Sequence, residues 1–103
     1  MQISLQSETL IVQGWAIDQV AGSTAGAVFI SIDGDTDFPA RYGADRPDIA
    51  ARFGNSRYRA SGFAAWFATS AVGKGPHVLS LKVVTHDKTG YYAPSHGVAV
   101  QIT

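Results

Sequence analysis

The sequence predicts an all-β sandwich of about seven antiparallel strands, and three observations support this fold class. Apolar and polar residues alternate with a period of two over several short segments, as they do in strands with one face in a core. Turn-forming Gly, Pro and Asp residues separate these segments at short intervals. The chain has 103 residues, of which 46% are hydrophobic, so we expect one domain with one core over residues 1–103.

The first half contains two strong strand segments and a return strand. In "ETLIVQGWAID" (8–18), Leu10, Val12, Gly14 and Ala16 share the inner face and Trp15 points outward. In "AVFISIDG" (27–34), alternate apolar residues again share one face, and the Asp-Gly pair predicts a hairpin turn. The return strand "TDFPARYG" (36–43) contains a proline, which cannot donate a ladder hydrogen bond, so it should lie at an edge.

The second half repeats this pattern. In "ASGFAAWFAT" (60–69), Phe63, Ala65 and Phe67 face inward, which leaves Trp66 facing outward. The segments "HVLSLKVVTHD" (77–87) and "HGVAVQIT" (96–103) also alternate and complete the predicted sandwich.

The segment "RPDIAARF" (46–53) is the one predicted helix, and we expect it to bridge strands of the two sheets. Arg46 suits the N-cap because it precedes proline, and Pro47 suits the first helical position, where an N–H is not needed. Asp48 in the first turn favours the helix dipole, so we assign Arg46, Pro47 and Asp48 a structural role. Ile49 and Phe53 share one face and should both be buried against the core.

Composition excludes several classes of protein. The formal net charge is zero, which argues against nucleic acid as a partner. There is no cysteine, so disulfides and thiolate metal sites are excluded. No apolar run reaches the length of a membrane span. The first residues lack the pattern of a signal peptide, which fits either a cytoplasmic protein or a domain excised from a larger protein, and we expect the latter.

The acidic turn "DGDTD" (33–37) begins like a calcium loop. An EF-hand requires glycine at its sixth position and glutamate at its twelfth, where this chain has Phe38 and Ala44. A hairpin turn with solvated carboxylates explains these residues, although a calcium site of another kind remains an alternative. We expect His77, His86 and His96 to be exposed residues at strand ends rather than zinc ligands. We therefore predict no metal and no cofactor.

No catalytic constellation is visible in the sequence. The chain has no serine on a sharp glycine-flanked turn, and a domain of this size leaves little room for the protected cleft of a two-carboxylate glycosidase. We therefore predict that the protein is not an enzyme.

Five motifs occur in order along the chain: "GWAID" (14–18), "IDG" (32–34), "YGADRPDIAARFG" (42–54), "SGF" (61–63) and "GKGPHVLSL" (73–81). This arrangement resembles a family of bacterial immunoglobulin-like accessory domains, which are appended to glycosyltransferases, cell-wall hydrolases and surface proteins. The resemblance implies an immunoglobulin-like antiparallel β-sandwich, a setting of glycan handling and an extracytoplasmic location, periplasmic or secreted.

The candidate ligand-binding residues are aromatic and basic. Outward-facing tryptophans at 15 and 66 could stack against sugar rings, unless loops, the helix or a neighbouring domain cover them. The segment 41–59 holds five arginines and two aspartates, which makes it locally basic. Within it, Arg57 and Arg59, with Tyr58 between them, are the expected ligand contacts.

Two functions therefore remain open. The first is a non-catalytic accessory module that binds glycan or a cell-surface polysaccharide. The alternative is a structural spacer, or a protein–protein interaction or dimerisation domain without a ligand, which contacts other domains of the parent polypeptide.

Overall fold

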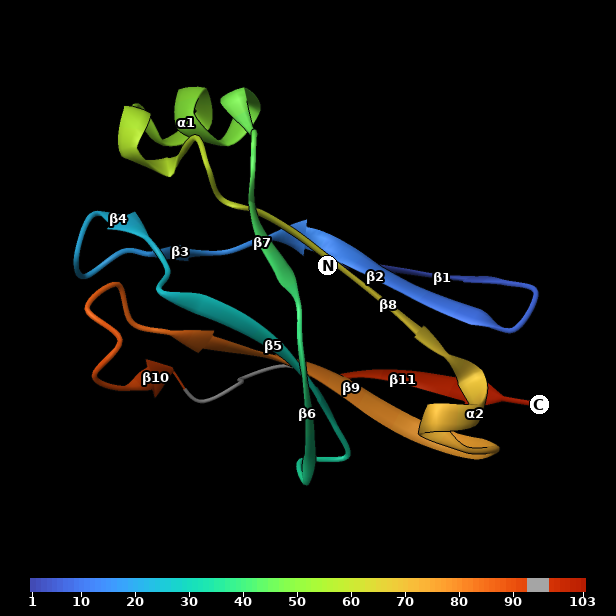
Figure 1. The fold of residues 1–103 in the computed structure, drawn as a ribbon. Coiled ribbons are helices and arrows are strands. Elements are labelled where there is room, and N and C mark those ends of the chain that lie inside the picture. The colour runs from blue at the N-terminus through green and yellow to red at the C-terminus, as the bar shows by residue number, and fades with distance from the viewer. Residues whose placement is uncertain (93–96) are drawn as a thin grey trace.

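The computed structural model describes residues 1–92 and 97–103, which form two antiparallel sheets packed together (Figure 1). The four-stranded sheet has the order β1 (Gln2–Gln6), β2 (Thr9–Trp15), β8 (Gly62–Ala68), β7 (Arg41–Ala44). The five-stranded sheet has the order β10 (Tyr91–Tyr92), β9 (Gly75–Val84), β5 (Ala27–Ile32), β6 (Thr36–Pro39), and β11 (Gly97–Ile102) also pairs with β9. The prediction of a β-rich, sandwich-like architecture of antiparallel strands is confirmed, although the described residues form eleven strands rather than about seven.

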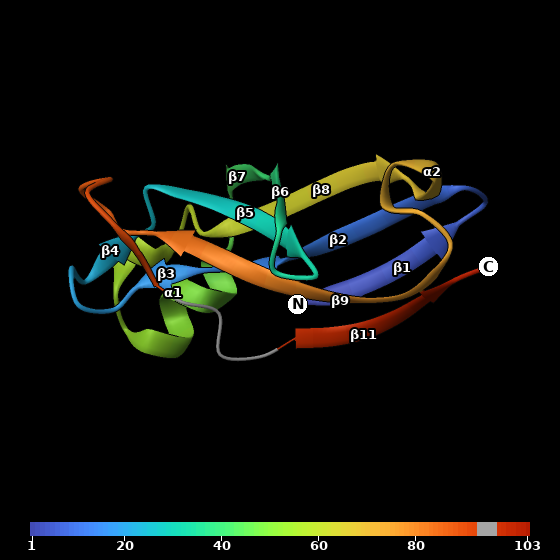
Figure 2. The same ribbon diagram turned by 90° about the horizontal axis from the view of Figure 1, so that it is seen from below.

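Short elements join these strands. A two-stranded ribbon consists of β3 (Ile17–Asp18) and β4 (Ser23–Thr24). The helical elements are α1 (Pro47–Phe53), a 3-10 turn (Ser56–Tyr58) and α2 (Thr69–Val72). Figures 1 and 2 show α1 at one end of the sandwich and α2 at the other. The sequence analysis predicted α1 alone, because the other two are single turns without a clear apolar period.

The core lies between the inner faces of the two sheets, and the predicted alternation is confirmed there. Buried side chains come from alternate positions of β2, β5, β8 and β9. Its buried members are Leu10, Val12, Ala16, Ala25, Val28, Ile30, Ile32, Phe63, Ala65 and Leu79. The residues between these positions on β2 and β8 therefore lie on the outer face of the four-stranded sheet.

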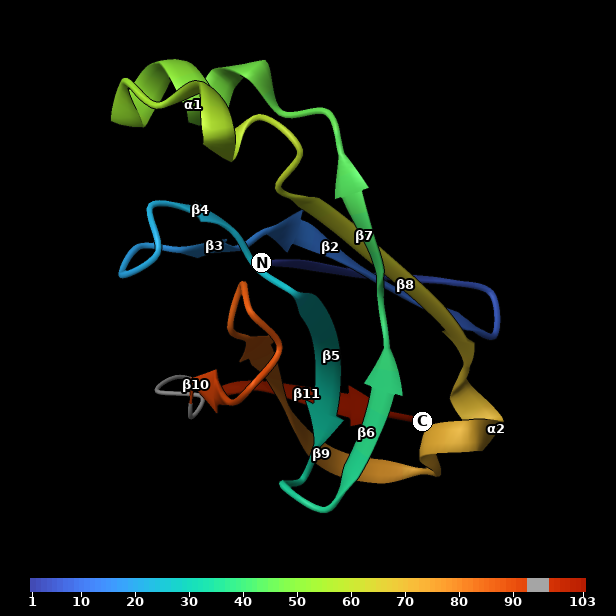
Figure 3. The same ribbon diagram turned by 60° about the vertical axis from the view of Figure 1, so that its left-hand side comes forward.

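The return strand after the acidic turn differs from the prediction. Its first part, β6, pairs with β5 at the edge of the five-stranded sheet, as Pro39 predicted. At Ala40 the chain leaves that sheet, and β7 joins the other sheet beside β8 (Figure 3). One predicted strand is thus two strands in two sheets. Tyr42 stabilises the segment that crosses between the sheets, because its hydroxyl donates to the Ala16 carbonyl at 2.7 Å and accepts from the Ala25 amide at 2.9 Å.

The N-terminal strand β1 was not predicted. It pairs with β2 and forms an edge of the four-stranded sheet. Its strand signal is weak because Ile3 and Leu5 are its only apolar residues, so most of its stability comes from pairing with β2.

Helix α1 begins at Pro47 as predicted, with Arg46 at the N-cap, and ends at Gly54, whose φ of 61° is left-handed. Two expectations about this helix are wrong. The helix connects β7 and β8, which are neighbours in one sheet, and does not bridge strands of the two sheets. Ile49 is buried, but Phe53 is 37% exposed, because its ring packs between Trp15 and Tyr58 rather than in the core.

Candidate functional site

Both tryptophans lie on the outer face of the four-stranded sheet. Trp66 on β8 is paired with Ile11 on β2, and Trp15 on β2 is paired with Gly62 on β8. These two pairs are four positions apart on β2, a distance of about 13 Å along the strand. The prediction that both side chains oppose the inward apolar positions is confirmed.

The two rings differ in how they are covered. Trp66 is 55% exposed, and the guanidinium carbon of Arg41 lies 6.0 Å from its ring centroid. Trp15 is half-buried, because the Phe53 ring meets it edge-on at 5.7 Å and the Arg52 guanidinium carbon lies 5.9 Å from its centroid. Trp66 is therefore open to solvent, while the end of α1 covers part of Trp15.

A hollow of about 510 Å³ lies between the two tryptophans. A row of four cross-strand neighbours runs across the sheet through the centre of the hollow. Its members are, in order, Arg41, Ala64, Gln13 and Gln2. The complete lining is Met1, Gln2, Gln13, Gly14, Trp15, Arg41, Ala44, Arg46, Gly62, Phe63, Ala64 and Trp66. The hollow thus has aromatic rings at its ends, hydrogen-bonding side chains in its middle row and small residues between them.

Gly62 allows β7 and β8 to approach each other at the end of this hollow near Trp15. A Cβ atom at this position would lie 2.9 Å from the Cβ of Ala44 and 3.1 Å from its carbonyl oxygen. It would also lie 3.1 Å from the Cγ of Arg46. The glycine of the "SGF" motif is therefore needed for the close approach of β7.

The five arginines of the segment 41–59 have different surroundings. Arg46 forms a two-bond ion pair with Asp48, with N–O distances of 3.0 and 2.9 Å. Arg59 forms a similar pair with Asp45, at 2.6 and 3.3 Å. These guanidinium groups lower the pKa of the Asp48 and Asp45 carboxyls by hydrogen bonding. The Arg46–Asp48 pair spans the start of α1. This position agrees with the structural role that the sequence predicted for both residues.

The predicted basic contacts lie away from the hollow. Arg57 and Arg59 are exposed on and after the 3-10 turn, and neither lines the hollow. Tyr58 is only 7% exposed, because its ring packs perpendicular to Phe53 at 5.6 Å. Tyr58, which was expected to contact a ligand, therefore has little surface to offer one.

Sequence analysis missed Arg41, Gln2 and Gln13 as residues of this surface. Gln13 could have been found, since it shares the outward face of its strand with Trp15. The place of Arg41 depends on the pairing of β7 with β8, and that of Gln2 on the pairing of β1 with β2. Neither pairing has a local signal in the sequence.

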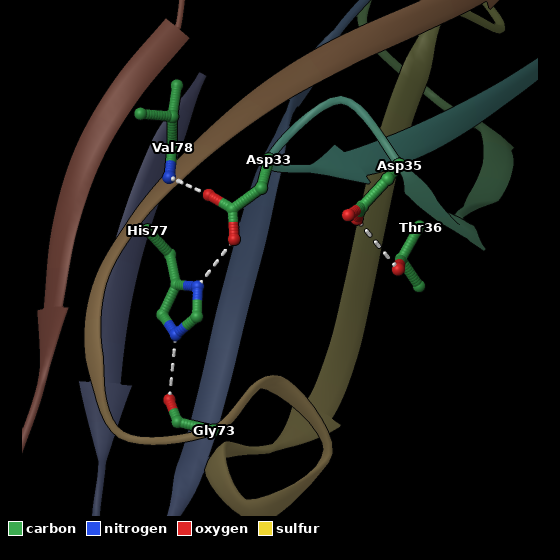
Figure 4. A network of polar contacts seen from close by, with 6 residues as sticks. All are labelled: Asp33, Asp35, Thr36, Gly73, His77 and Val78. Atoms are coloured by element: carbon green, nitrogen blue, oxygen red, sulfur yellow. Dashed lines mark hydrogen bonds and ion pairs between the residues drawn. The ribbon is translucent and has the colours of Figure 1, made fainter.

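The three carboxylates of the acidic turn have separate partners. Asp33 accepts from the Val78 amide at 2.8 Å and lies 2.7 Å from Nδ1 of His77, whereas Asp35 turns away toward Thr36 (Figure 4). Asp37 pairs with Lys82 at 3.0 Å. The turn therefore joins β5 and β6 to β9 and does not gather its carboxylates around one point.

Asp18, outside the acidic turn, also has structural partners. Asp18 is buried and accepts from the Tyr92 hydroxyl and from the amides of His86 and Ala21. These hydrogen bonds, that of Tyr92 first, lower the pKa of the Asp18 carboxyl. Among residues 1–92 and 97–103, no group of three His, Asp or Glu side chains is placed to hold a metal ion. His96 lies outside the described residues.

Comparison with known proteins gives no relative, since no protein-family model, curated protein or solved structure matches this chain. In the part of the chain that the structure describes, none of the helices has the length and apolar character that crossing a membrane requires.

Proposed function

We propose that this chain is a non-catalytic accessory domain that binds glycan on the outer face of its four-stranded sheet. The observation that carries the proposal is the pair of tryptophans on that face, with the hollow between them. The C–H groups on one side of a pyranose ring are apolar and electropositive, so they stack against the negative face of an aromatic ring. Trp66 offers such a face to solvent.

The middle row of the hollow supplies the polar contacts that a saccharide needs. Arg41 has only N–H donors, whereas the side-chain amides of Gln13 and Gln2 both donate and accept. Sugar hydroxyls can therefore be bound between the two rings. Because the hollow lies on the outer face of a sheet and is accessible to solvent, we expect weak binding by a single domain, with a Kd of about 0.1–1 mM, or roughly 4–5.5 kcal/mol.

We also propose that the fold is immunoglobulin-like, in agreement with the resemblance of the five sequence motifs. The order β1-β2-β8-β7 corresponds to strands A, B, E and D of an immunoglobulin domain, and β5-β9-β11 corresponds to C, F and G. This correspondence supports membership of the bacterial accessory-domain family. It therefore also supports a parent protein that handles glycans outside the cytoplasm.

The test is a glycan array probed with the 103-residue protein, with and without calcium, followed by titration of the glycans that bind. Trp66→Ala should abolish measurable binding, because it removes the exposed stacking surface, and the melting temperature should hardly change. Tyr91→Ala is the matched control, since Tyr91 is an exposed aromatic residue on the other sheet. If Trp66→Ala leaves the affinity unchanged, this face is not the binding site.

The alternative function, a spacer or protein-interaction domain, also has an observation in its favour. A second hollow, of about 390 Å³, has a mainly apolar lining of Trp15, Ala16, Ile17, Gln19, Val20, Leu81, Val83 and Tyr92. Such a surface suits a neighbouring domain better than a sugar, because it offers few hydrogen-bonding groups. Absence of binding to every glycan on the array would favour this alternative.

A further inference from the structure

We propose that the hollow between Trp15 and Trp66 selects carboxylate-bearing saccharides, of the kind found in uronic acid polymers. The proposal rests on the glycan-binding function above and names the chemical class of its ligand. It is carried by the charge of the lining residues and by the position of Arg41 beside the exposed ring of Trp66.

The hollow is basic although the whole chain is neutral. Two arginines contribute to its lining, and aspartate and glutamate do not. The charge of Arg46 is compensated by Asp48, which lies outside the hollow. Arg41 has no carboxylate within 4.0 Å among residues 1–92 and 97–103, and its guanidinium group lies over the ring of Trp66. The guanidinium charge of Arg41 is therefore available to a ligand.

The position of Arg41 suits a charged sugar stacked on Trp66. The guanidinium carbon is 6.0 Å from the ring centroid, so a pyranose that covers the ring brings its substituents to the guanidinium group. The planar guanidinium group binds a carboxylate through two parallel N–H donors. Ala64, the cross-strand partner of Arg41, has a small side chain and leaves room for that carboxylate.

The single guanidinium group of Arg41 suits a carboxylate. A carboxylate carries one negative charge, which matches the single uncompensated arginine of the lining. The next residues of the row, Gln13 and Gln2, are neutral and suit the hydroxyl groups of the same or the next sugar. A nucleic acid would require several cations along its path.

The experiment compares acidic oligosaccharides with their methyl esters, which keep the rings and hydroxyls but lose the charge. Oligogalacturonate, oligomannuronate and hyaluronan fragments, each with its ester, are titrated into the full 103-residue protein by calorimetry. At least one acid should bind about tenfold or more tightly than its ester, a difference of roughly 1.4 kcal/mol. Raising the salt concentration should reduce that difference.

Substitutions at Arg41 and Ala64, in the middle row of the hollow, test whether Arg41 recognises the carboxylate. Arg41→Gln should remove the preference for the acid, so that the acid and its ester bind this variant with equal affinity. Ala64→Glu should also remove it, because a carboxylate would then stand opposite Arg41, and Ala64→Gln is its uncharged control. Arg57→Gln is the control for loss of an exposed arginine outside the hollow, and it should retain the preference.

The outcomes separate this proposal from the proposed function. Equal affinity for acid and ester, or binding of neutral glycans alone, would overturn the selection of carboxylates and leave glycan binding intact. A preference that survives in Arg41→Gln would also overturn it. Failure of every acidic and neutral glycan to bind would overturn both proposals.

Discussion

Replacing Ile49 with alanine tests how α1 is held on the end of the sandwich. The helix has seven residues, which is too short to be stable by itself, and Ile49 is its one buried residue at 3% exposure. Truncation of a buried isoleucine to alanine removes its transfer free energy and leaves a cavity, so we expect a loss of ~2–4 kcal/mol in the free energy of unfolding. For a domain of this size, such a loss lowers the melting temperature by about 10 °C or more.

The assay is urea unfolding followed by circular dichroism, with thermal melting as a second measure. Ala51→Ser is the matched control, because Ala51 is exposed on the same helix, and it should cost less than about 1 kcal/mol. A loss below ~0.5 kcal/mol for Ile49→Ala would refute the reasoning, since it would mean that α1 is a loose segment. Phe53, at the end of α1, would then not hold the Trp15 ring in a fixed position.

Two further predictions concern Gly62 and His77. Gly62→Ala should lower the free energy of unfolding by ~1–3 kcal/mol, because the added Cβ would clash with Ala44. Gly90→Ala is the control and should cost little, because a Cβ at that position meets nothing within 4 Å. Equal losses for the two variants in urea unfolding would contradict the close approach of β7. The hydrogen bond that Nδ1–H of His77 donates to the Asp33 carboxylate raises the pKa of His77 and lowers the pKa of Asp33. The pair therefore stabilises the fold above pH ~4 and below pH ~6.5, and the His77 contribution is lost as pH rises through its raised pKa. His77→Gln should lower the melting temperature more at pH 5.5 than at pH 9, and Asp33→Asn should remove this pH dependence; equal losses at both pH values would show that the pair does not form.

Local patterns predicted the strand faces and the helix, because their physical causes are local. A period of two assigns each side chain of β2 and β8 to one face, so the outward position of both tryptophans follows from the sequence. Pro47 and Gly54 mark the ends of α1 through their own backbone preferences.

Features that depend on distant residues could not be predicted in this way. The strand with Pro39 changes sheets at Ala40 because β7 pairs with β8, about twenty residues further along the chain. The sequence does not show that Arg59 pairs with Asp45, fourteen residues earlier in the chain. It also does not show the surroundings of Arg41, because its neighbours come from cross-strand pairs. Sequence therefore located the aromatic part of the candidate site, and the structure added its basic residue.

The most direct test of glycan binding on this face is nuclear magnetic resonance with ¹⁵N-labelled protein. Amide and indole signals are followed as an oligosaccharide that the protein binds is added. The account predicts that shifts concentrate on the outer face of the four-stranded sheet, at Gln13, Trp15, Arg41, Ala64 and Trp66, and that both indole N–H signals move. Shifts confined to β5, β9 and β11, or movement of neither indole signal at saturation, would contradict it.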